Sequence, residues 1–287
     1  MGEDLCGAFP DVRALFAEAD DALGLPLSRI IRDGPEDELR RTAITQPAIL
    51  LVSIAAYRAL DLAPAAVAGH SLGEYSALVA AGALRFRDAL VLVHKRGRYM
   101  QEAVPEGRGI MLALIGAEPD AIAQAIAADG GAVDIANYNA PGQIVIAGER
   151  EAARRVAFQC GARQAIELAV SAPFHCRLMQ PAEERLRADL AAVEFSDPVV
   201  PLYNNVDARK VTTAAAARDG VARQVSRAVR WTESIERMIG DEDIRALVEV
   251  GPGTVLSGMI RRIDRGVERL AASDCATVAA VRARFAA

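Results

Sequence analysis

Residues 64–73, Pro64-Ala65-Ala66-Val67-Ala68-Gly69-His70-Ser71-Leu72-Gly73, form the stretch of sequence that decides the fold. A short apolar run ends at Gly69, which is typical of a buried parallel strand. The next residues match G-x-S-x-G, and a helix is predicted over residues 72–82. A strand, a sharp turn and a helix in this order are typical of a nucleophile elbow, which points its serine into a cleft. The stretch therefore predicts an α/β fold with Ser71 as candidate nucleophile.

The chemistry of such an elbow explains the residue types that it contains. Glycines on both sides of the serine allow backbone segments to approach closely at the turn. The N-terminus of the following helix offers backbone N–H groups, beginning with that of Leu72, to an oxyanion that develops during acyl transfer. The alternative is a chance G-x-S-x-G loop, and the predicted strand and helix around Ser71 favour the elbow.

Length and composition indicate a folded globular protein. The 287 residues correspond to about two domains, and 52% of them are hydrophobic while 25% are charged. This balance excludes disorder for most of the chain. No run of about 18 uncharged apolar residues occurs, so no membrane span is expected, and the acidic start of the chain is unlike a signal peptide. The net charge of −5 does not favour nucleic acid or an anionic membrane as partner.

The cysteines indicate a reducing compartment. The four cysteines are far apart in the sequence and no pair has CxxC spacing (Cys6, Cys160, Cys176 and Cys275). Neither a zinc site nor a disulfide framework is therefore predicted. We expect a cytoplasmic protein.

The middle of the chain predicts an inserted unit. Between residues 107 and 170 the expected order of elements is β-α-β-β-α-β, which is typical of a ferredoxin-like subdomain. The strands predicted over 133–137 and 143–147 flank the turn signal Asn-Ala-Pro-Gly at residues 139–142. Because strands and helices alternate again after residue 170, this unit is predicted to lie within a larger α/β unit.

Three histidines are candidates for the base that a serine nucleophile needs. His70 is adjacent to the serine, and side chains one residue apart at such a turn diverge. His94 lies on a helix predicted over residues 86–102, where an ordinary surface histidine is the favoured interpretation. His175 lies where the chain leaves the inserted unit, and a residue at such a junction can face a cleft. Spacing alone does not decide whether His175 is the base.

Together these segments resemble the malonyl-CoA:acyl-carrier-protein transacylase family. The resemblance covers nearly the whole chain in order, with segments at residues 69–75 (GHSLGEY), 95–105 (KRGRYMQEAVP), 137–143 (NYNAPGQ), 170–175 (VSAPFH) and 249–253 (EVGPG). The fold that it implies is an α/β-hydrolase-like core with an inserted ferredoxin-like subdomain. Residues 1–104 and 175–287 would form the large catalytic domain, and residues 105–174 the subdomain.

The resemblance also assigns roles to residues. It implies that Ser71 is the acylated nucleophile, that the backbone N–H of Leu72 is an oxyanion donor, and that His175 is the general base and later the acid. Gln224 would orient the histidine through its backbone carbonyl, in place of a triad aspartate. Arg96 would hold the free malonyl carboxylate, and a guanidinium can bind a carboxylate with two parallel hydrogen bonds.

The resemblance implies two partners, malonyl-CoA and an acyl carrier protein, and no metal or bound organic cofactor. Because such carriers are acidic, we expect a basic patch near the cleft. Four arginines between residues 261 and 269 are one candidate, with a solvated helix face as the alternative (Arg261, Arg262, Arg265 and Arg269). Phe174 either narrows the acyl pocket or packs at the junction, and the sequence favours neither.

The start of the chain departs from the family pattern. Members normally begin with a short strand and a Gly-Gln-Gly-Ser-Gln loop, whose first glutamine supplies a second oxyanion N–H. Residues 1–5 of this sequence align with the family's Gly-Met-Gly-x-Asp-Leu, just after that loop. We expect that the natural start lies upstream of Met1; the alternative is a protein that lacks this strand and this donor.

The function implied by the resemblance is transfer of a malonyl group from malonyl-CoA to the phosphopantetheine thiol of acyl carrier protein, in fatty-acid biosynthesis. A stand-alone acyltransferase of a polyketide synthase is an alternative within the same class. A serine thioesterase or hydrolase, or a non-catalytic scaffold, are alternatives from other classes. Arg96 distinguishes the malonyl transferase from the hydrolase, because a general esterase needs no residue that binds a carboxylate.

Overall fold

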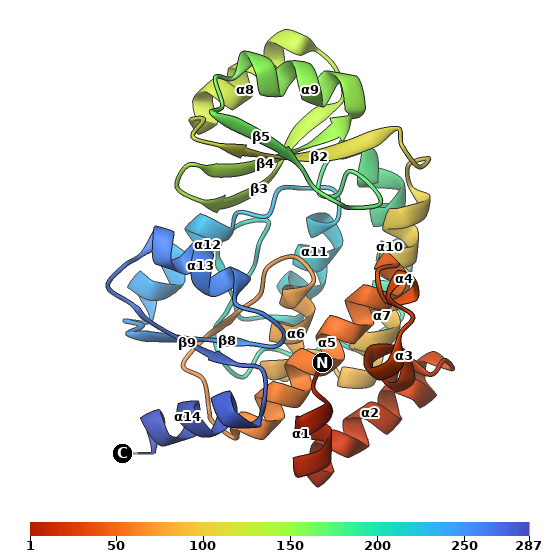
Figure 1. Ribbon diagram of the computed structural model, residues 1–287, viewed down its shortest axis with the longest axis vertical. Coiled ribbons are helices and arrows are strands. Elements are labelled where there is room, and N and C mark those ends of the chain that lie inside the picture. The colour runs from red at the N-terminus through yellow and green to blue at the C-terminus, as the bar shows by residue number, and fades with distance from the viewer. Residues whose placement is uncertain (287) are drawn as a thin grey trace.

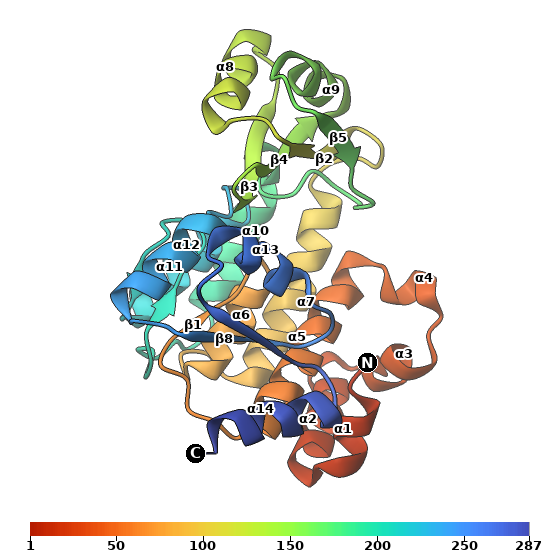
Figure 2. The ribbon, with the colours of Figure 1, turned by 60° about the vertical axis from the view of Figure 1, so that its left-hand side comes forward.

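The chain forms two parts, one above the other in Figures 1 and 2. The computed structural model describes residues 1–286. One part, at the top of Figure 1, is an antiparallel sheet covered by two helices. The other contains the remaining helices around short parallel strands. This is the α/β fold class that the sequence predicts.

The helices have the following bounds: α1 Glu3–Ala8, α2 Pro10–Leu23, α3 Leu27–Asp33, α4 Glu36–Leu39, α5 Thr42–Leu60, α6 Gly73–Ala80, α7 Phe86–Glu102, α8 Pro119–Asp129, α9 Arg150–Gln159, η1 Arg177–Met179, α10 Gln180–Ala191, α11 Ala214–Gln224, α12 Trp231–Asp241, α13 Val255–Ile263 and α14 Cys275–Phe285. The strands are β1 Val67–Ala68, β2 Gly109–Ile115, β3 Val133–Ala140, β4 Gln143–Glu149, β5 Gln164–Glu167, β6 Leu202–Tyr203, β7 Lys210–Val211, β8 Ala246–Val250 and β9 Glu268–Ala272.

The antiparallel sheet has the strand order β3-β4-β2-β5, with α8 and α9 on one face (Figure 2). Chain order and sheet order together are those of a ferredoxin-like unit. A separate apolar core fills the space between the sheet and the two helices. β3 and β4 are joined at Pro141-Gly142, where Gly142 has a φ of 69°. Proline before a glycine with positive φ suits a two-residue turn of this kind.

Helix α5 is the central element of the larger part. Among the described residues, α5 is the one helix that is long and apolar enough to cross a membrane. However, 78% of its most apolar 18-residue window is buried inside the protein. It packs closely on α7, because a Cβ at Gly97 would lie 2.5 Å from the backbone oxygen of Thr42. The glycine therefore allows α7 to cross α5 closely, and the preceding residue, Arg96, is buried by this contact.

The parallel strands of the larger part are short. β1 pairs in parallel with β6, and β6 pairs antiparallel with β7. β8 and β9 form a separate parallel pair. The strand predicted over residues 64–68 contains only Val67 and Ala68, the two residues that align with Leu202 and Tyr203. Even so, β1 places the elbow at its carboxyl end, where ligands bind in open α/β sheets.

One difference from the sequence prediction connects the two parts. A helix is expected over residues 217–229, but α11 ends at Gln224. The reason is that Val229 pairs with β3: its N–H donates to the Ala136 carbonyl at 2.8 Å, and its carbonyl accepts from the Tyr138 N–H at 2.9 Å. After α11 the chain turns at residues 225–227, and Val229 then joins the antiparallel sheet to the larger part.

Candidate active site

The elbow holds Ser71 in a left-handed conformation, with φ of 53°. Such a conformation is uncommon outside glycine and persists where surrounding contacts determine it. Here the buried side chain of Asn205 supplies them: its Oδ1 accepts from the Ser71 N–H at 2.7 Å, and its Nδ2 donates to the Gly69 carbonyl at 2.8 Å. A Cβ at Gly69 would lie 1.9 Å from the Gly73 oxygen, so the first glycine of the motif is required, whereas Gly73 has open space around it.

The structure brings three of the predicted residues together. His175 Nε2 lies 2.7 Å from Ser71 Oγ, and His175 Nδ1 lies 2.8 Å from the backbone oxygen of Gln224. A carbonyl oxygen can only accept, so Nδ1 carries the proton and Nε2 presents its lone pair to the serine hydroxyl. This arrangement is competent for nucleophilic catalysis.

The environment of His175 keeps its imidazole neutral. The residue is 4% exposed and has a φ of 59°, so both reacting residues have left-handed backbone conformations. Burial lowers the pKa of His175 to about 3, and the nearby positive charge of Arg96 contributes to this shift. A neutral imidazole is the form that can accept a proton from Ser71.

Arg96 is buried beside this pair, with 1% of its surface exposed. Its Nη1 donates to Gln46 Oε1 at 2.7 Å, and its Nη2 donates to Gln224 Oε1 at 2.9 Å and to Ser71 Oγ at 3.2 Å. All three partners are neutral, and its buried Nε has no partner within residues 1–286. Burial therefore lowers the pKa of Arg96 from its usual range. A cation buried without a carboxylate is suited to bind an anionic ligand.

The backbone N–H of Leu72 is a candidate oxyanion donor. Leu72 directly precedes α6, and its N–H donates to no acceptor within the described part of the chain. The first N–H groups of a helix have no partner inside the helix. The Ser71 N–H, by contrast, is occupied by Asn205.

The remaining predicted positions have packing roles in the structure. His70 Nε2 lies 2.8 Å from Asn139 Oδ1, and its ring lies edge-on to Trp231. His94 is half-buried and pairs through Nδ1 with the Ala43 carbonyl at 2.8 Å, so it is more enclosed than the surface position expected for it. Phe174 packs against two of the apolar cores at the junction.

Three buried polar residues at the site were not assigned a role from the sequence: Gln46, Glu74 and Asn205. A signal existed for Gln46, because it is a polar residue within the otherwise apolar α5. Asn205 follows Asn204 just after β6, at the carboxyl end of a strand, which is where side chains reach a site. Glu74 lies inside the recognised motif, but the sequence does not show what it contacts.

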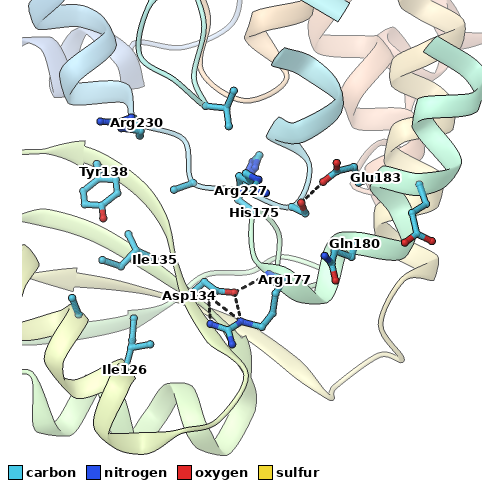
Figure 3. A pocket seen from close by; sticks show the side chains of 15 residues that line it. Ile126, Asp134, Ile135, Tyr138, His175, Arg177, Gln180, Glu183, Arg227 and Arg230 are labelled. Carbon is cyan, nitrogen blue, oxygen red and sulfur yellow. Dashed lines mark hydrogen bonds and ion pairs between the residues drawn. The ribbon is translucent and has the colours of Figure 1, made fainter. Parts of the chain in front are cut away.

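A cavity of about 660 Å³ opens in front of His175 (Figure 3). Asp134, Ile135 and Tyr138 of β3 line one side, and Gln180 and Glu183 of α10 line the other. The lining is mixed, with several hydrogen-bonding groups, as expected for a site that receives a polar chain. Within residues 1–286, no group of three or more His, Cys, Asp and Glu is placed to hold a metal ion.

A second hollow, of about 560 Å³, is lined by arginines alone: Arg261, Arg262, Arg265 and Arg269. None of the four forms an ion pair with a carboxylate of residues 1–286. Arg262 donates to the Pro141 carbonyl at 2.8 Å and so connects α13 to the β3–β4 turn. We call these four residues the arginine patch.

Comparisons with known proteins agree with this geometry. The family model of the acyl transferase domain matches residues 1–282. The chain is 48% identical over 282 residues to the malonyl CoA-acyl carrier protein transacylase of Escherichia coli strain K12, covering 95% of this chain and 90% of that protein. This chain belongs to the malonyl-CoA:acyl-carrier-protein transacylase family. The family's enzyme from Bacillus subtilis strain 168 is 43% identical over 287 residues, covering 97% of this chain and 90% of that protein.

Solved structures of the family have the same fold. The acyl carrier protein S-malonyltransferase of Vibrio cholerae is 44% identical, with a TM-score of 0.94, and the match covers 98% of this chain and 94% of that one. A malonyl-transacylase solved in complex with its type II polyketide synthase acyl-carrier protein is 45% identical, with a TM-score of 0.95, and the match covers 99% and 94%. The predicted family and fold class are therefore confirmed.

Proposed function

We propose that this protein transfers a malonyl group from malonyl-CoA to the phosphopantetheine thiol of an acyl carrier protein, in fatty-acid biosynthesis, through a malonyl ester of Ser71. The observation that carries the proposal is the buried guanidinium of Arg96, which has no carboxylate partner and lies 3.2 Å from the nucleophile. A malonyl thioester provides both groups that this site requires, a carboxylate for Arg96 and an acyl carbon for Ser71.

In the first half-reaction, the malonyl carboxylate binds Arg96 and the thioester carbon lies against Ser71 Oγ. His175 Nε2 takes the hydroxyl proton as the oxygen attacks, and the oxyanion that forms lies near the Leu72 N–H. The carbon–sulfur bond then breaks. The proton on His175 passes to the departing sulfur, so free coenzyme A leaves and malonyl-Ser71 remains.

In the second half-reaction, the carrier's phosphopantetheine thiol attacks the ester carbonyl. His175 Nε2 takes the thiol proton and then gives it to Ser71 Oγ as the ester bond breaks. The products are the malonyl-carrier thioester and the free enzyme. The Gln224 carbonyl keeps the Nδ1 proton in place through both halves, so that Nε2 alone exchanges protons.

Substrate binding strengthens the base. In the free enzyme, burial and, after it, the Arg96 charge lower the pKa of His175 to about 3. A malonyl carboxylate paired with Arg96 cancels much of that charge, so the part of the shift that Arg96 causes is reduced and the pKa of His175 rises, while burial still holds it below its ordinary value. The imidazole therefore accepts the serine proton more readily when the correct acyl group is bound.

The arginine patch is the surface that we propose for the carrier protein. Acidic carriers bind basic surfaces through charge complementarity, which speeds their encounter. We further propose that residues 1–104 and 175–287 form one large catalytic domain and that residues 105–174 form a ferredoxin-like subdomain inserted in it. We place the reaction in the cytoplasm, and the four free cysteine thiols are consistent with a reducing compartment.

Replacing Arg96 tests the proposed function. In Arg96→Ala, malonyl-Ser71 formation from malonyl-CoA is expected to fall about 100-fold or more, because the substrate carboxylate is then buried without a partner. Acylation by acetyl-CoA, which carries no carboxylate, is expected to be retained or to rise. Intact-protein mass spectrometry after rapid mixing measures both rates.

The control for this experiment is Arg98→Ala, which removes a half-exposed arginine from the same helix. It is expected to leave both acylation rates unchanged. Malonyl rates that are equal in wild type and Arg96→Ala would contradict the malonyl assignment and favour a general serine hydrolase. A wild-type protein that gives no ester at Ser71 would favour a non-catalytic scaffold.

A further inference from the structure

The buried carboxylate of Glu74 has no part in the steps described above. Glu74 lies in the first turn of α6, three residues after the nucleophile, and is 1% exposed. Its Oε2 accepts from Gln224 Nε2 at 2.7 Å and from the Asn205 N–H at 3.0 Å. Placing a carboxylate in an apolar interior is costly unless hydrogen bonds compensate for the lost water. Burial raises the pKa of Glu74 to about 7, which reflects this cost.

The partner of Glu74 is the side-chain amide that contacts Arg96. Gln224 is fully buried, and its Nε2 donates to Glu74 at 2.7 Å, to the Ser71 carbonyl at 2.9 Å and, more weakly, to Asn205 Oδ1 at 3.3 Å. Its Oε1 faces the other way and accepts from Arg96 Nη2 at 2.9 Å. An amide has donors at one end and an acceptor at the other, so fixing the NH₂ end determines which atom the guanidinium meets.

We infer that Glu74 is a positioning residue for acyl-group selection: by binding the NH₂ end of the Gln224 amide, it directs Oε1 toward Arg96 and so aims the guanidinium at the substrate carboxylate. The inference deepens the proposed function and rests on it. A reversed amide would place an NH₂ group against the guanidinium, and donor would then face donor. Glu74 therefore acts on Arg96 through one intermediate side chain.

The backbone of Gln224 separates this effect from the catalytic pair. The carbonyl that accepts from His175 belongs to the last residue of α11, and the helix fixes its position independently of the side chain. Loss of the Glu74 contact should therefore affect the contact to Arg96 much more than the orientation of His175. Substrates with a carboxylate should lose rate, while neutral acyl groups should be nearly unaffected.

Three substitutions at position 74 separate hydrogen bonding from charge. Glu74→Ala removes the acceptor. Glu74→Gln keeps an oxygen at the same reach without the charge, and Glu74→Asp keeps the charge but is one methylene too short to reach Gln224. The measured quantity is the ratio of kcat/KM for Ser71 acylation by malonyl-CoA to that by acetyl-CoA, which cancels any general loss of folded enzyme.

We expect the ratio to fall about tenfold in Glu74→Ala and Glu74→Asp, the scale of one charge-assisted hydrogen bond, and to stay within about threefold of wild type in Glu74→Gln. Ser234→Ala is the matched control, because Ser234 is also a buried hydrogen-bonding residue but contacts only the Asn204 and Arg230 carbonyls. Its ratio is expected to equal that of wild type.

Two results would overturn the inference while leaving the proposed function intact. One is an unchanged ratio in Glu74→Asp and Glu74→Ala when the wild type forms malonyl-Ser71. The other is a wild-type ratio in Glu74→Asp with a reduced ratio in Glu74→Gln, which would assign the effect to charge. If Glu74→Ala does not fold, the Asp and Gln variants decide alone. Absence of malonyl-Ser71 in the wild type would instead refute the proposed function, and this inference with it.

Discussion

At the scale of single residues, the site balances one buried cation against one buried carboxylate that does not touch it. Arg96 and Glu74 are both about 1% exposed, and the Gln224 amide lies between them. A direct ion pair would occupy the guanidinium, whereas a relay through an amide leaves it available to a substrate anion. The protein thereby keeps a binding charge in its interior without neutralising it.

Glu74 also makes stability depend on pH in a specific direction. The pKa of Glu74 is raised to about 7 in the folded protein, whereas an unfolded glutamate has its ordinary value of 4.5. The folded state therefore binds more protons between these values, and the contribution of Glu74 to stability decreases as pH rises from about 4.5 to 7. Glu74→Gln has no such titration.

We therefore expect the stability of Glu74→Gln, relative to wild type, to be more favourable at pH 8 than at pH 5. Urea unfolding of both proteins at the two pH values measures the difference. A difference between variant and wild type that is the same at both pH values would contradict the raised pKa of this carboxyl group.

Residue patterns predicted part of this site. The G-x-S-x-G stretch indicated Ser71 without a structure, because a nucleophile elbow is encoded by adjacent residues. The resemblance supplied His175, Arg96 and Gln224. The contacts of Glu74 and Asn205 were beyond sequence reasoning, because their partners, Gln224 and Ser71, lie 150 and 134 residues away. Hydrogen bonds between such distant side chains leave no local pattern.

At the scale of elements, the close crossing of α5 and α7 sets the position of Arg96. The helices are in contact at Gly97, where a Cβ would meet the backbone of Thr42 and Ala43 at 2.5 and 2.8 Å. The sequence predicted α7 with its observed bounds, 86–102, because its apolar spacing is regular. It predicted β1 and the end of α11 less well, because these bounds depend on contacts with distant segments. Val67 of β1 pairs with Leu202, and Val229, after α11, pairs with β3.

Gly97→Ala is expected to push the two helices apart. Overpacking of this kind costs about 1–3 kcal/mol of stability, and the displaced Arg96 should raise the KM for malonyl-CoA. Thermal unfolding and steady-state kinetics measure the two effects.

Gly240→Ala is the matched control for this substitution, because this exposed glycine of α12 has nothing within 4 Å of its added Cβ. We expect it to be neutral or stabilising by up to about 1 kcal/mol. Equal stability of the two alanine variants would contradict the role given to the helix crossing.

At the scale of the whole molecule, charge is distributed unevenly. The chain carries a net charge of −5, yet the arginine patch has no acidic partner within the described residues. It lies on and after α13, and its Arg262 contacts the β3–β4 turn of the antiparallel sheet. An acidic carrier would therefore meet repulsion over most of the surface and attraction here.

Reversing two charges of the patch tests this placement. In the double variant Arg261→Glu and Arg265→Glu, the KM for the carrier protein is expected to rise about tenfold at low ionic strength, and less at high salt. The rate of malonyl-Ser71 formation from malonyl-CoA should not change. Arg262 is left intact because it contacts the β3–β4 turn.

The control carries the same change in net charge elsewhere: Arg13→Glu and Arg29→Glu, two exposed arginines of α2 and α3. If both double variants raise the carrier KM equally, the effect comes from net charge and the patch has no special role. If neither does, the carrier docks on another surface.

The order in which the site residues occur along the chain has a consequence for biosynthesis. Ser71 and His175 are separated by 104 residues, and Ser71 and the Gln224 amide by 153. During translation the ribosome releases the nucleophile and Arg96 long before the base, and the carbonyl that fixes the base emerges later still. A growing chain therefore contains the nucleophile and the arginine before it contains the base that catalysis requires. Chemical competence appears only after Gln224 has been added to the chain.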